Sequence, residues 1–175
     1  SAATLAIVAD MLSIAPTALP RPAPMADADW VTLSQEGFPP VHAGRFLVHT
    51  STNLSGPVPD GVVPFLIEAG RAFGTGGHET TSGCLAMLDA MKRRGAVFRN
   101  ILDVGTGTGI LAFAARHLWP SARVTASDID PVSVDVAAEN ARVDGVPLGE
   151  ASGQIAFCSA PGLAHRRIAG RAPYD

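Results

Sequence analysis

The sequence predicts an α/β protein whose centre is a doubly wound, mostly parallel, Rossmann-like sheet. After residue 70, short apolar runs of strand length alternate with longer runs of helical spacing. Strands that alternate with helices in this way form parallel sheets covered on both faces. A glycine-rich turn, "GTGTG", joins the first of these strands to the next helix, where doubly wound sheets bind ligands. The composition, 47% apolar and 17% charged residues, is typical of a globular chain.

The N-terminal part is predicted to hold a short helix, a stiff connector and two strands. Residues 3–13 are amphipathic, and the four prolines of residues 15–24 interrupt any helix that follows. "GRFLVHT" (44–50) and "VVPFLIEAG" (62–70) are predicted strands. Pro64 argues against a central place for the second of them, since proline cannot donate a ladder hydrogen bond.

The C-terminal part has clear element boundaries. The helix predicted over 80–95 has basic residues in its last turn and ends at Gly95, with Cys84, Leu88 and Met91 on one face. The elements that follow are, in order, a strand over 100–104, a helix over 110–119, a strand over 122–127, a helix within 131–145, a strand over 154–159 and the beginning of a further strand at 173–175.

Charge and composition bound the possible functions. The net charge of −3 argues against broad electrostatic binding to nucleic acid, though not against a local basic patch, and no direct nucleic-acid partner is expected. The five histidines show no metal-ligand spacing, so no metal is expected. Cys84 and Cys158 are predicted to be buried in a reduced, cytoplasmic protein. The N-terminus lacks the basic region of a signal peptide, and no segment reaches the roughly 20 apolar residues of a membrane span.

The glycine-rich turn lies in "ILDVGTGTGIL", residues 101–111. A merely tight turn would need one glycine or two, so Gly105, Gly107 and Gly109, which follow Asp103, predict a ligand site. The dinucleotide fingerprint G-x-G-x-x-G fails, because Ile110 stands where its third glycine belongs.

Two carboxylates follow the next strand. Asp128 is placed to accept hydrogen bonds from both hydroxyl groups of a ribose. Asp130, directly before Pro131, is predicted to cap the next helix instead. A glycine loop with a ribose carboxylate and without a pyrophosphate signature fits S-adenosylmethionine better than NAD.

A second unusual stretch, "AFGTGGHETT" at residues 72–81, precedes a helix. Taken singly, Thr80 and Thr81 fit helix capping, and His78 fits a solvated loop histidine. As a whole, the string closely resembles the signature of the PrmA family, which methylates ribosomal protein L11. "ILDVGTGTGILAFAA" and "SDIDPVSVDVAAENARVDGV" resemble the same family's glycine loop and ribose-binding segment, and the resemblance covers about residues 27–146.

The resemblance implies a class I methyltransferase fold with S-adenosylmethionine as cofactor. It implies a remnant of an N-terminal substrate domain plus linker over residues 1–45, and a methyltransferase domain over residues 46–175. Because the family's Asn-Ile-Leu motif and last strands are not found, we expect a sheet truncated at its C-terminal end, in a fragment of a longer protein. The implied cofactor-binding residues are Phe73, Gly74, Thr75, Thr81, Asp103, Gly105, Thr106, Gly107, Gly109 and Asp128.

The implied reaction is methyl transfer to lysine and α-amino groups of ribosomal protein L11. The acceptor must be unprotonated, which at pH 7 costs about 4–5 kcal/mol for a lysine and about 1 kcal/mol for an α-amino group. Alignment and desolvation meet this need without a strong general base, so no catalytic residue is assigned. Two alternatives stay open: a methyltransferase of another protein or a small molecule, and a cofactor-binding module without turnover.

Overall fold

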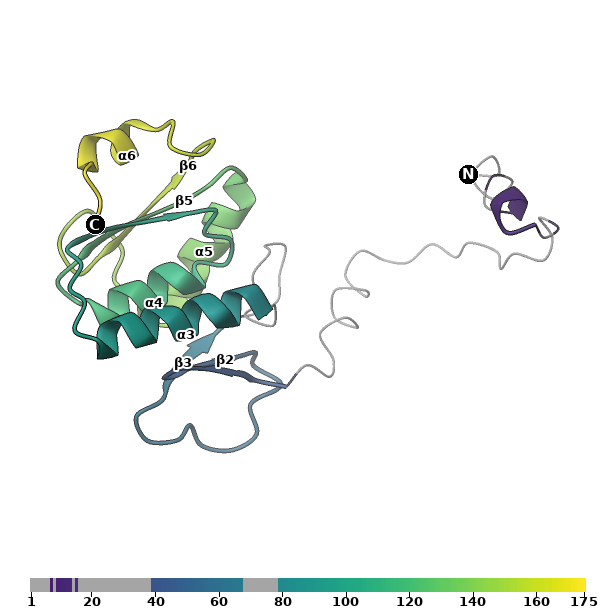
Figure 1. Cartoon of the computed structure of the whole chain (residues 1–175), viewed down its shortest axis with the longest axis horizontal. Coiled ribbons are helices and arrows are strands. Elements are labelled where there is room, and N and C mark those ends of the chain that lie inside the picture. Colours follow the sequence, from purple (N-terminus) through teal and green to yellow (C-terminus); the bar gives the residue numbers. More distant parts are fainter. Residues whose placement is uncertain (1–6, 8, 14, 16–38, 68–78) are drawn as a thin grey trace. The chain divides into compact units, whose positions relative to one another are not determined.

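The computed structural model describes residues 7, 9–13, 15, 39–67 and 79–175 (Figure 1). The chain divides into two compact units, residues 1–34 and residues 35–175. In the first unit, residues 7 and 9–11 are helical, within the helix predicted over 3–13. Most of the predicted connector, and residues 72–78 of the "AFGTGGHETT" stretch, lie outside the described residues.

A small sheet comes first in the second unit. β1 (Val41–Ala43) and β2 (Phe46–His49) form an antiparallel hairpin, and β3 (Val63–Leu66) pairs with β2 in parallel. The order β1-β2-β3 places β3 at an edge, where the missing N–H of Pro64 leaves no ladder position empty. The two predicted strands are confirmed, and so is the inference that Pro64 argues against a central strand.

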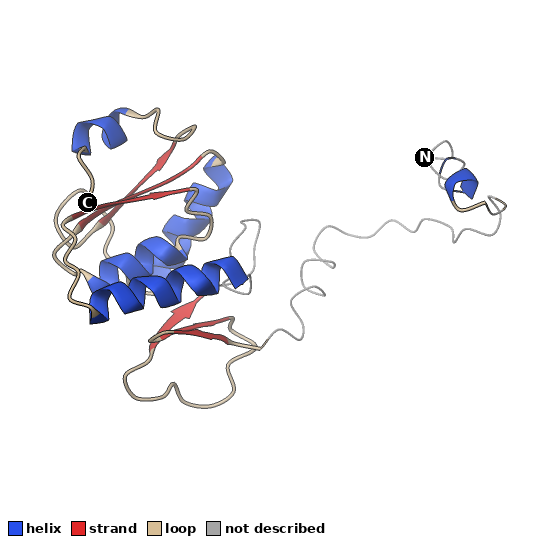
Figure 2. Cartoon of the chain, in the orientation of Figure 1, coloured by secondary structure: helices blue, strands red, loops and turns tan. Residues whose placement is uncertain are grey.

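The larger sheet is the parallel, doubly wound sheet that the sequence predicts. β4 (Asn100–Val104), β5 (Arg123–Asp128) and β6 (Ile155–Ser159) are parallel and lie in the order β4-β5-β6. α4 (Ile110–Leu118) and α5 (Pro131–Val143) connect them, close to their predicted bounds. Figure 2 shows helices on both sides of the strands of this sheet.

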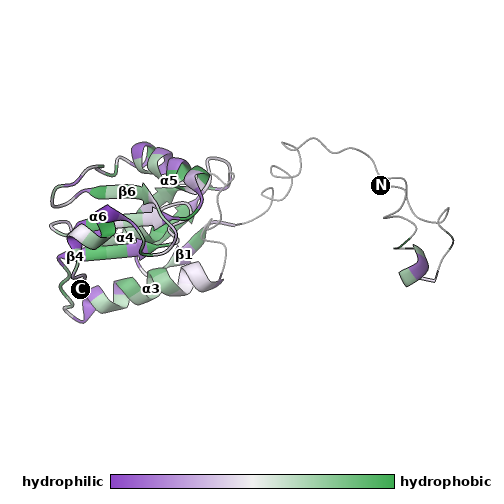
Figure 3. Ribbon diagram, turned by 90° about the horizontal axis from the view of Figure 1, so that it is seen from above, coloured by the Kyte–Doolittle hydropathy of each residue, from purple (hydrophilic) through white to green (hydrophobic). Residues whose placement is uncertain are grey.

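The main hydrophobic core lies on the face of the larger sheet that α4 covers. Phe113 of α4 is fully buried, and its ring meets Phe65 edge to face at 6.0 Å between centroids. Phe65 in turn stacks on Phe46 at 5.5 Å. These three rings join the small sheet to α4, which covers the larger sheet. Figure 3 shows the resulting pattern, with hydrophobic strands and α4 inside and many hydrophilic positions on α5.

The opposite face is covered by α6 (Arg166–Arg171), a helix that is not predicted from the sequence. This helix has only six residues, three of them arginines, so it shows no apolar helical spacing. Ile168 packs against Cys158 and Ala160. The predicted burial of Cys158 is therefore confirmed.

α3 (Glu79–Arg93) buries a different face from the one that its apolar residues indicate. The predicted face consists of Cys84, Leu88 and Met91. The structure instead buries Leu85 and Asp89 and leaves Cys84 exposed, so the prediction that Cys84 is buried is wrong. Leu88 is only partly buried.

Ion pairing explains the shifted face of α3. Asp89 is 1% exposed, and its Oδ1 lies 2.6 Å from Nε of Arg45, while Oδ2 pairs with Arg93. A carboxylate can occupy such a core position only when it is paired and hydrogen-bonded. A prediction from hydrophobic spacing places Asp89 in solvent, and it therefore turns the wrong face of α3 toward the core.

The last residues of the chain run along the free edge of β4. The backbone N–H of Asp175 donates to the carbonyl of Asn100 at 3.0 Å, and the Asp175 carboxylate accepts the N–H of Asn100 at 2.9 Å. No strand forms at the predicted 173–175, although Asp175 makes this contact with β4. Within the described part of the chain, no helix is both long and apolar enough to cross a bilayer.

Candidate functional site

Three glycines shape the turn between β4 and α4. Gly105, Gly107 and Gly109 have φ angles of 76°, 55° and 89°, a region that L side chains rarely adopt. The turn alone therefore needs all three, and the premise that a tight turn needs only one or two is wrong. A Cβ on Gly109 would lie 2.6 Å from Cζ of Phe113, whereas one on Gly105 would meet nothing within 4 Å. Gly105 thus leaves open room beside the backbone.

The N–H groups of this turn are bonded within the protein. Those of Gly105 and Thr106 both donate to the carbonyl of Ser127, at 2.8 and 2.9 Å, and that of Gly109 donates to the carbonyl of Thr106 at 2.9 Å. Loops that cradle a phosphate direct several free N–H groups at it. This turn is therefore held in shape by its own hydrogen bonds and is not arranged to bind an anion.

Asp128, the last residue of β5, holds the turn from the neighbouring strand. Its Oδ2 accepts the N–H of Gly107 at 2.9 Å, and its Oδ1 accepts the N–H of Asp130 at 3.0 Å. Two carboxylate oxygens offer about four acceptor positions, so Asp128 retains capacity for a ligand. Asp130 itself accepts the N–H of Val132 at 3.0 Å with Pro131 at the first helical position, which confirms its predicted role as the N-cap of α5.

Asp103 supplies a second carboxylate at this edge of the sheet. Its Oδ2 accepts the hydroxyl of Thr106 at 2.7 Å. Burial raises the pKa of Asp103, the hydrogen bonds from Thr106 and from the Ala112 backbone oppose this rise, and the negative charge of Asp128 adds to it. Asp103 and Asp128 therefore interact electrostatically, and when both are ionised this edge attracts positive charge.

Two exposed apolar side chains stand beside these carboxylates. Val104 follows Asp103 and is 50% exposed, while Ile129 follows Asp128 and is 72% exposed. Neither residue is among the cofactor-binding residues predicted from the sequence. Their adjacency to the two carboxylates was the available signal, because strand ends at a ligand-binding edge carry apolar contacts as well as polar ones.

The structure brings six of the ten predicted cofactor-binding residues together at the carboxyl-terminal edge of the larger sheet, and these are Asp103, Gly105, Thr106, Gly107, Gly109 and Asp128. Phe73, Gly74 and Thr75 lie outside the described residues. Thr81 lies in the first turn of α3, which begins at Glu79, and its side chain is half-buried. Thr81 therefore does not start the helix, as a capping residue would.

The arrangement can bind a ligand, and among the described residues that form it only the two carboxylates could act as an acid or a base. Both are engaged in the hydrogen bonds that shape the turn. In residues 79–175 and the other described segments, no three His, Cys, Asp or Glu side chains gather into a group that could hold a metal ion. What this edge offers a ligand is shape, apolar contact, hydrogen-bond acceptors and negative charge.

Comparison with known proteins gives a consistent result. Residues 8–155 match the family model described as ribosomal protein L11 methyltransferase (PrmA). The chain is 45% identical over 151 residues to the ribosomal protein L11 methyltransferase of Rhizobium meliloti (strain 1021), covering 86% of this chain and 49% of that protein. It is 48% identical over 149 residues to the corresponding protein of Rhizobium etli (strain CIAT 652), covering 85% and 48%. The chain thus spans about half the length of the curated relatives it matches.

A solved structure agrees with these relatives. The crystal structure of a ribosomal protein L11 methylase from Lactobacillus delbrueckii subsp. bulgaricus superposes with a TM-score of 0.51 at 25% sequence identity. The match covers 68% of this chain and 57% of that chain.

Proposed function

The chain belongs to the ribosomal protein L11 methyltransferase (PrmA) family, and from this premise we propose that it binds S-adenosylmethionine and serves the methylation of ribosomal protein L11. The pair of carboxylates beside the glycine turn, Asp103 and Asp128, is the observation that carries the choice of cofactor. S-adenosylmethionine has a cationic sulfonium and an ammonium group, which Asp103 and Asp128 attract. A pyrophosphate would face the same two carboxylates, and the turn's N–H groups are already bonded to the protein.

Asp128 is proposed to bind the ribose of the cofactor. Its oxygens have acceptor capacity left after bonding Gly107 and Asp130, and two adjacent hydroxyls suit a carboxylate. Ile129 and Val104 would cover apolar parts of the ligand. Gly105 leaves the space in which the ligand approaches the backbone, since a Cβ there would meet no protein atom.

The segment 72–81 is proposed to complete the pocket, as the family resemblance implies for Phe73, Gly74, Thr75 and Thr81. N–H groups in the first turn of a helix carry partial positive charge, which suits the carboxylate at the methionine end of the cofactor. Thr81 lies in that turn. In this arrangement Asp103 and Thr106 fix the glycine turn, while Thr81 contacts the ligand directly.

The proposed reaction transfers a methyl group to lysine and α-amino groups of ribosomal protein L11. The bound cofactor supplies a methyl group already activated by its sulfonium. The protein's part is to hold donor and acceptor in line and to keep water away, which favours the unprotonated amine. We place this reaction in the cytoplasm, and we assign residues 46–175 to the cofactor-binding domain and residues 1–45 to the linker and substrate-domain remnant.

Three titrations and one transfer assay test the proposal. In calorimetric titrations of this chain we expect binding of S-adenosylmethionine and S-adenosylhomocysteine and none of NAD; binding of NAD alone would overturn the cofactor assignment. In the transfer assay, the chain is mixed with purified ribosomal protein L11 and methyl-labelled cofactor. Label on L11 amino groups supports the proposed activity. Cofactor binding without label on L11 would reject that activity and favour a binding module.

A further inference from the structure

Two hollows lie near β6, the outer strand of the larger sheet. One, of about 600 Å³, is lined by α6 and the end of β6, and the other, of about 510 Å³, lies at the amino-terminal ends of β4 and β5. Glu150 lines both, so the hollows adjoin at this residue. They contain five arginines, which together form the arginine surface: Arg99, Arg123, Arg166, Arg167 and Arg171.

The arginine surface is basic in a chain that is acidic as a whole. Its five positive charges face the carboxylates of Glu150 and Asp175, whereas the whole chain has a net charge of −3. Arg123 and Arg166 are exposed and form no ion pair with any residue that the structure describes. Unpaired positive charge gathered on one face is the electrostatic footprint of polyanion binding.

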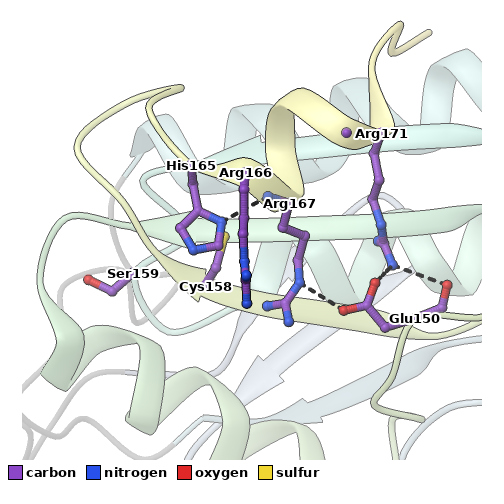
Figure 4. Close-up of a pocket in the computed structure, with 8 residues that line it drawn as sticks. Glu150, Cys158, Ser159, His165, Arg166, Arg167 and Arg171 are labelled. Carbon is purple, nitrogen blue, oxygen red and sulfur yellow. Dashed lines mark hydrogen bonds and ion pairs between the residues drawn. The ribbon is translucent and has the colours of Figure 1, made fainter.

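Glu150 fixes two of these guanidinium groups. Its carboxylate lies 2.8 Å from Nε of Arg167 and pairs also with Arg171, whose side chain is only 9% exposed and donates to the hydroxyl of Thr125 at 2.9 Å (Figure 4). Figure 4 shows that Arg166 extends from α6 in the same direction as these two side chains. Guanidinium forks held in place in advance suit phosphate oxygens, because little side-chain freedom is lost on binding.

Protection of the outer strand β6 from pairing with another strand explains only some of the arginines of the arginine surface. Arg167 donates to the carbonyl of Phe157 in β6, and such a contact helps to keep another strand from pairing there. Arg123 begins β5, and Arg166 begins α6 without an ion pair. Neither side chain is needed to close the edge of β6.

We propose that the arginine surface binds the sugar–phosphate backbone of RNA. No Phe, Tyr or Trp side chain is among the residues that line either hollow, so base stacking is absent from the interaction and phosphate contacts dominate it. Binding is accordingly independent of sequence and strongly dependent on salt. This interaction differs from the sequence-based expectation of no nucleic-acid partner, which rested on net charge and left a local basic patch open.

The position of the surface relates it to the glycine turn. Arg123 and Asp128 are the first and last residues of β5, about 16 Å apart at the rise of a strand. Ser159, which lines the larger hollow, pairs in register with Asp128. An RNA strand on the arginine surface therefore runs toward the cofactor edge. The choice of RNA over other polyanions rests on the proposed function, since a ribosomal protein acceptor can be presented on its RNA.

Fluorescence anisotropy with a labelled oligouridine tests the proposal directly. We expect the chain to bind it with an affinity that falls steeply as KCl rises. Arg123→Gln and Arg166→Gln should each weaken binding by about two- to fivefold at low salt and reduce the slope of log affinity against log salt by about 0.7 per lost phosphate contact. Arg142→Gln is the matched control. It removes one arginine from an exposed pair on α5, outside both hollows, and should leave affinity and slope unchanged.

Three results would overturn the proposal. The first is that the Arg123→Gln/Arg166→Gln double variant binds oligouridine as tightly as the unchanged chain. The second is that Arg142→Gln weakens binding as much as the double variant does. The third is that a labelled oligoglutamate peptide binds more tightly than oligouridine and depends on the same arginines, which would make an acidic polypeptide the partner. The assay contains no methyl donor, so its failure is distinct from a failure of the proposed methylation. Arg123→Gln should also bind S-adenosylmethionine like the unchanged chain.

Discussion

The carboxylate of Asp128 and the backbone N–H of Gly107 are joined by a hydrogen bond of 2.9 Å across 21 positions of sequence. This bond ties the end of β5 to the glycine turn that follows β4. One side chain therefore shapes the turn and, in the proposed function, also binds the ligand. Substitutions at Asp128 test both roles, and the neighbouring Asp130 gives a natural comparison.

We predict that Asp128→Ala weakens S-adenosylmethionine binding much more than Asp130→Ala does. Loss of a charge-assisted ribose contact should cost about 1.5–3 kcal/mol of binding free energy. Loss of the Asp130 cap of α5 should cost about 1 kcal/mol of folding stability and little binding. Calorimetric titration and thermal melting of both variants separate the two effects. Asp128→Asn serves as a control that keeps one acceptor oxygen for Gly107. The opposite order of binding losses would show that the two carboxylates have been assigned wrongly.

Thr81→Val should impair cofactor binding and leave the melting temperature of the ligand-free chain nearly unchanged. Thr81 lies inside the first turn of α3, two residues after the helix begins at Glu79, so its hydroxyl is not required as a cap. Valine keeps the shape of threonine and removes the hydroxyl. A variant that melts earlier but binds normally would assign Thr81 to the helix alone.

Alanine at two glycines of the turn should have two different effects. Gly105→Ala places a residue at a φ of 76° in open space, so it should cost about 1–2 kcal/mol of stability through backbone strain. Gly109→Ala adds a contact of 2.6 Å with Phe113 and should cost about 1–3 kcal/mol more. Urea unfolding measures both. Gly105→Ala should also reduce cofactor affinity, and unchanged affinity would remove Gly105 from the binding site.

Arg45→Ala should destabilise the chain more than Arg93→Ala. Arg45 meets the buried Oδ1 of Asp89 at 2.6 Å, and its removal leaves that oxygen unsatisfied, at about 1–3 kcal/mol. Arg93 is 63% exposed and pairs with Asp89 one helical turn away, an arrangement worth about 0.3–0.5 kcal/mol. Chemical unfolding of the two variants gives the comparison. Equal losses would mean that solvent reaches Asp89 when either partner is absent.

Asp144 should make the chain less stable as the pH rises above about 4. Burial raises the pKa of Asp144, although the N–H of Leu66, which donates to Oδ1 at 2.9 Å, and the charge of His49 oppose the rise. A carboxyl with a higher pKa in the folded chain binds its proton more tightly there, so stability falls as the pH rises through the folded pKa. The melting temperature of the unchanged chain minus that of Asp144→Asn should therefore be larger at pH 4 than at pH 7. A difference independent of pH would contradict this.

The sequence was sufficient for the order of elements from β4 to β6 because strand and helix periods are local properties. β4 to β6 and their connecting helices follow directly from apolar runs bounded by glycine and proline. The buried face of α3 was not accessible in the same way, since Asp89 is inside only because Arg45, which is 44 residues away, neutralises it. α6 has too few apolar residues to give a helical signal.

The candidate site shows the same division. The capping role of Asp130 could be predicted from the sequence, because a proline directly after it marks a helix start. The sequence could not show why the turn has three glycines, because a positive φ angle and room for a ligand both favour glycine. The arginine surface was missed because its members come from β5, α6 and the residue before β4, which only the folded chain brings to one side.

The glycine turn holds its shape through bonds to Ser127, Thr106 and Asp128. A turn that is ordered before the ligand binds loses little conformational entropy on binding, so little binding free energy is lost in ordering it. Such a turn selects ligands by shape, because it cannot change its conformation to fit a ligand of a different shape. Adaptation to new donors, such as analogues with bulkier transferable groups, would therefore have to come from replacing residues around the turn rather than from bending it.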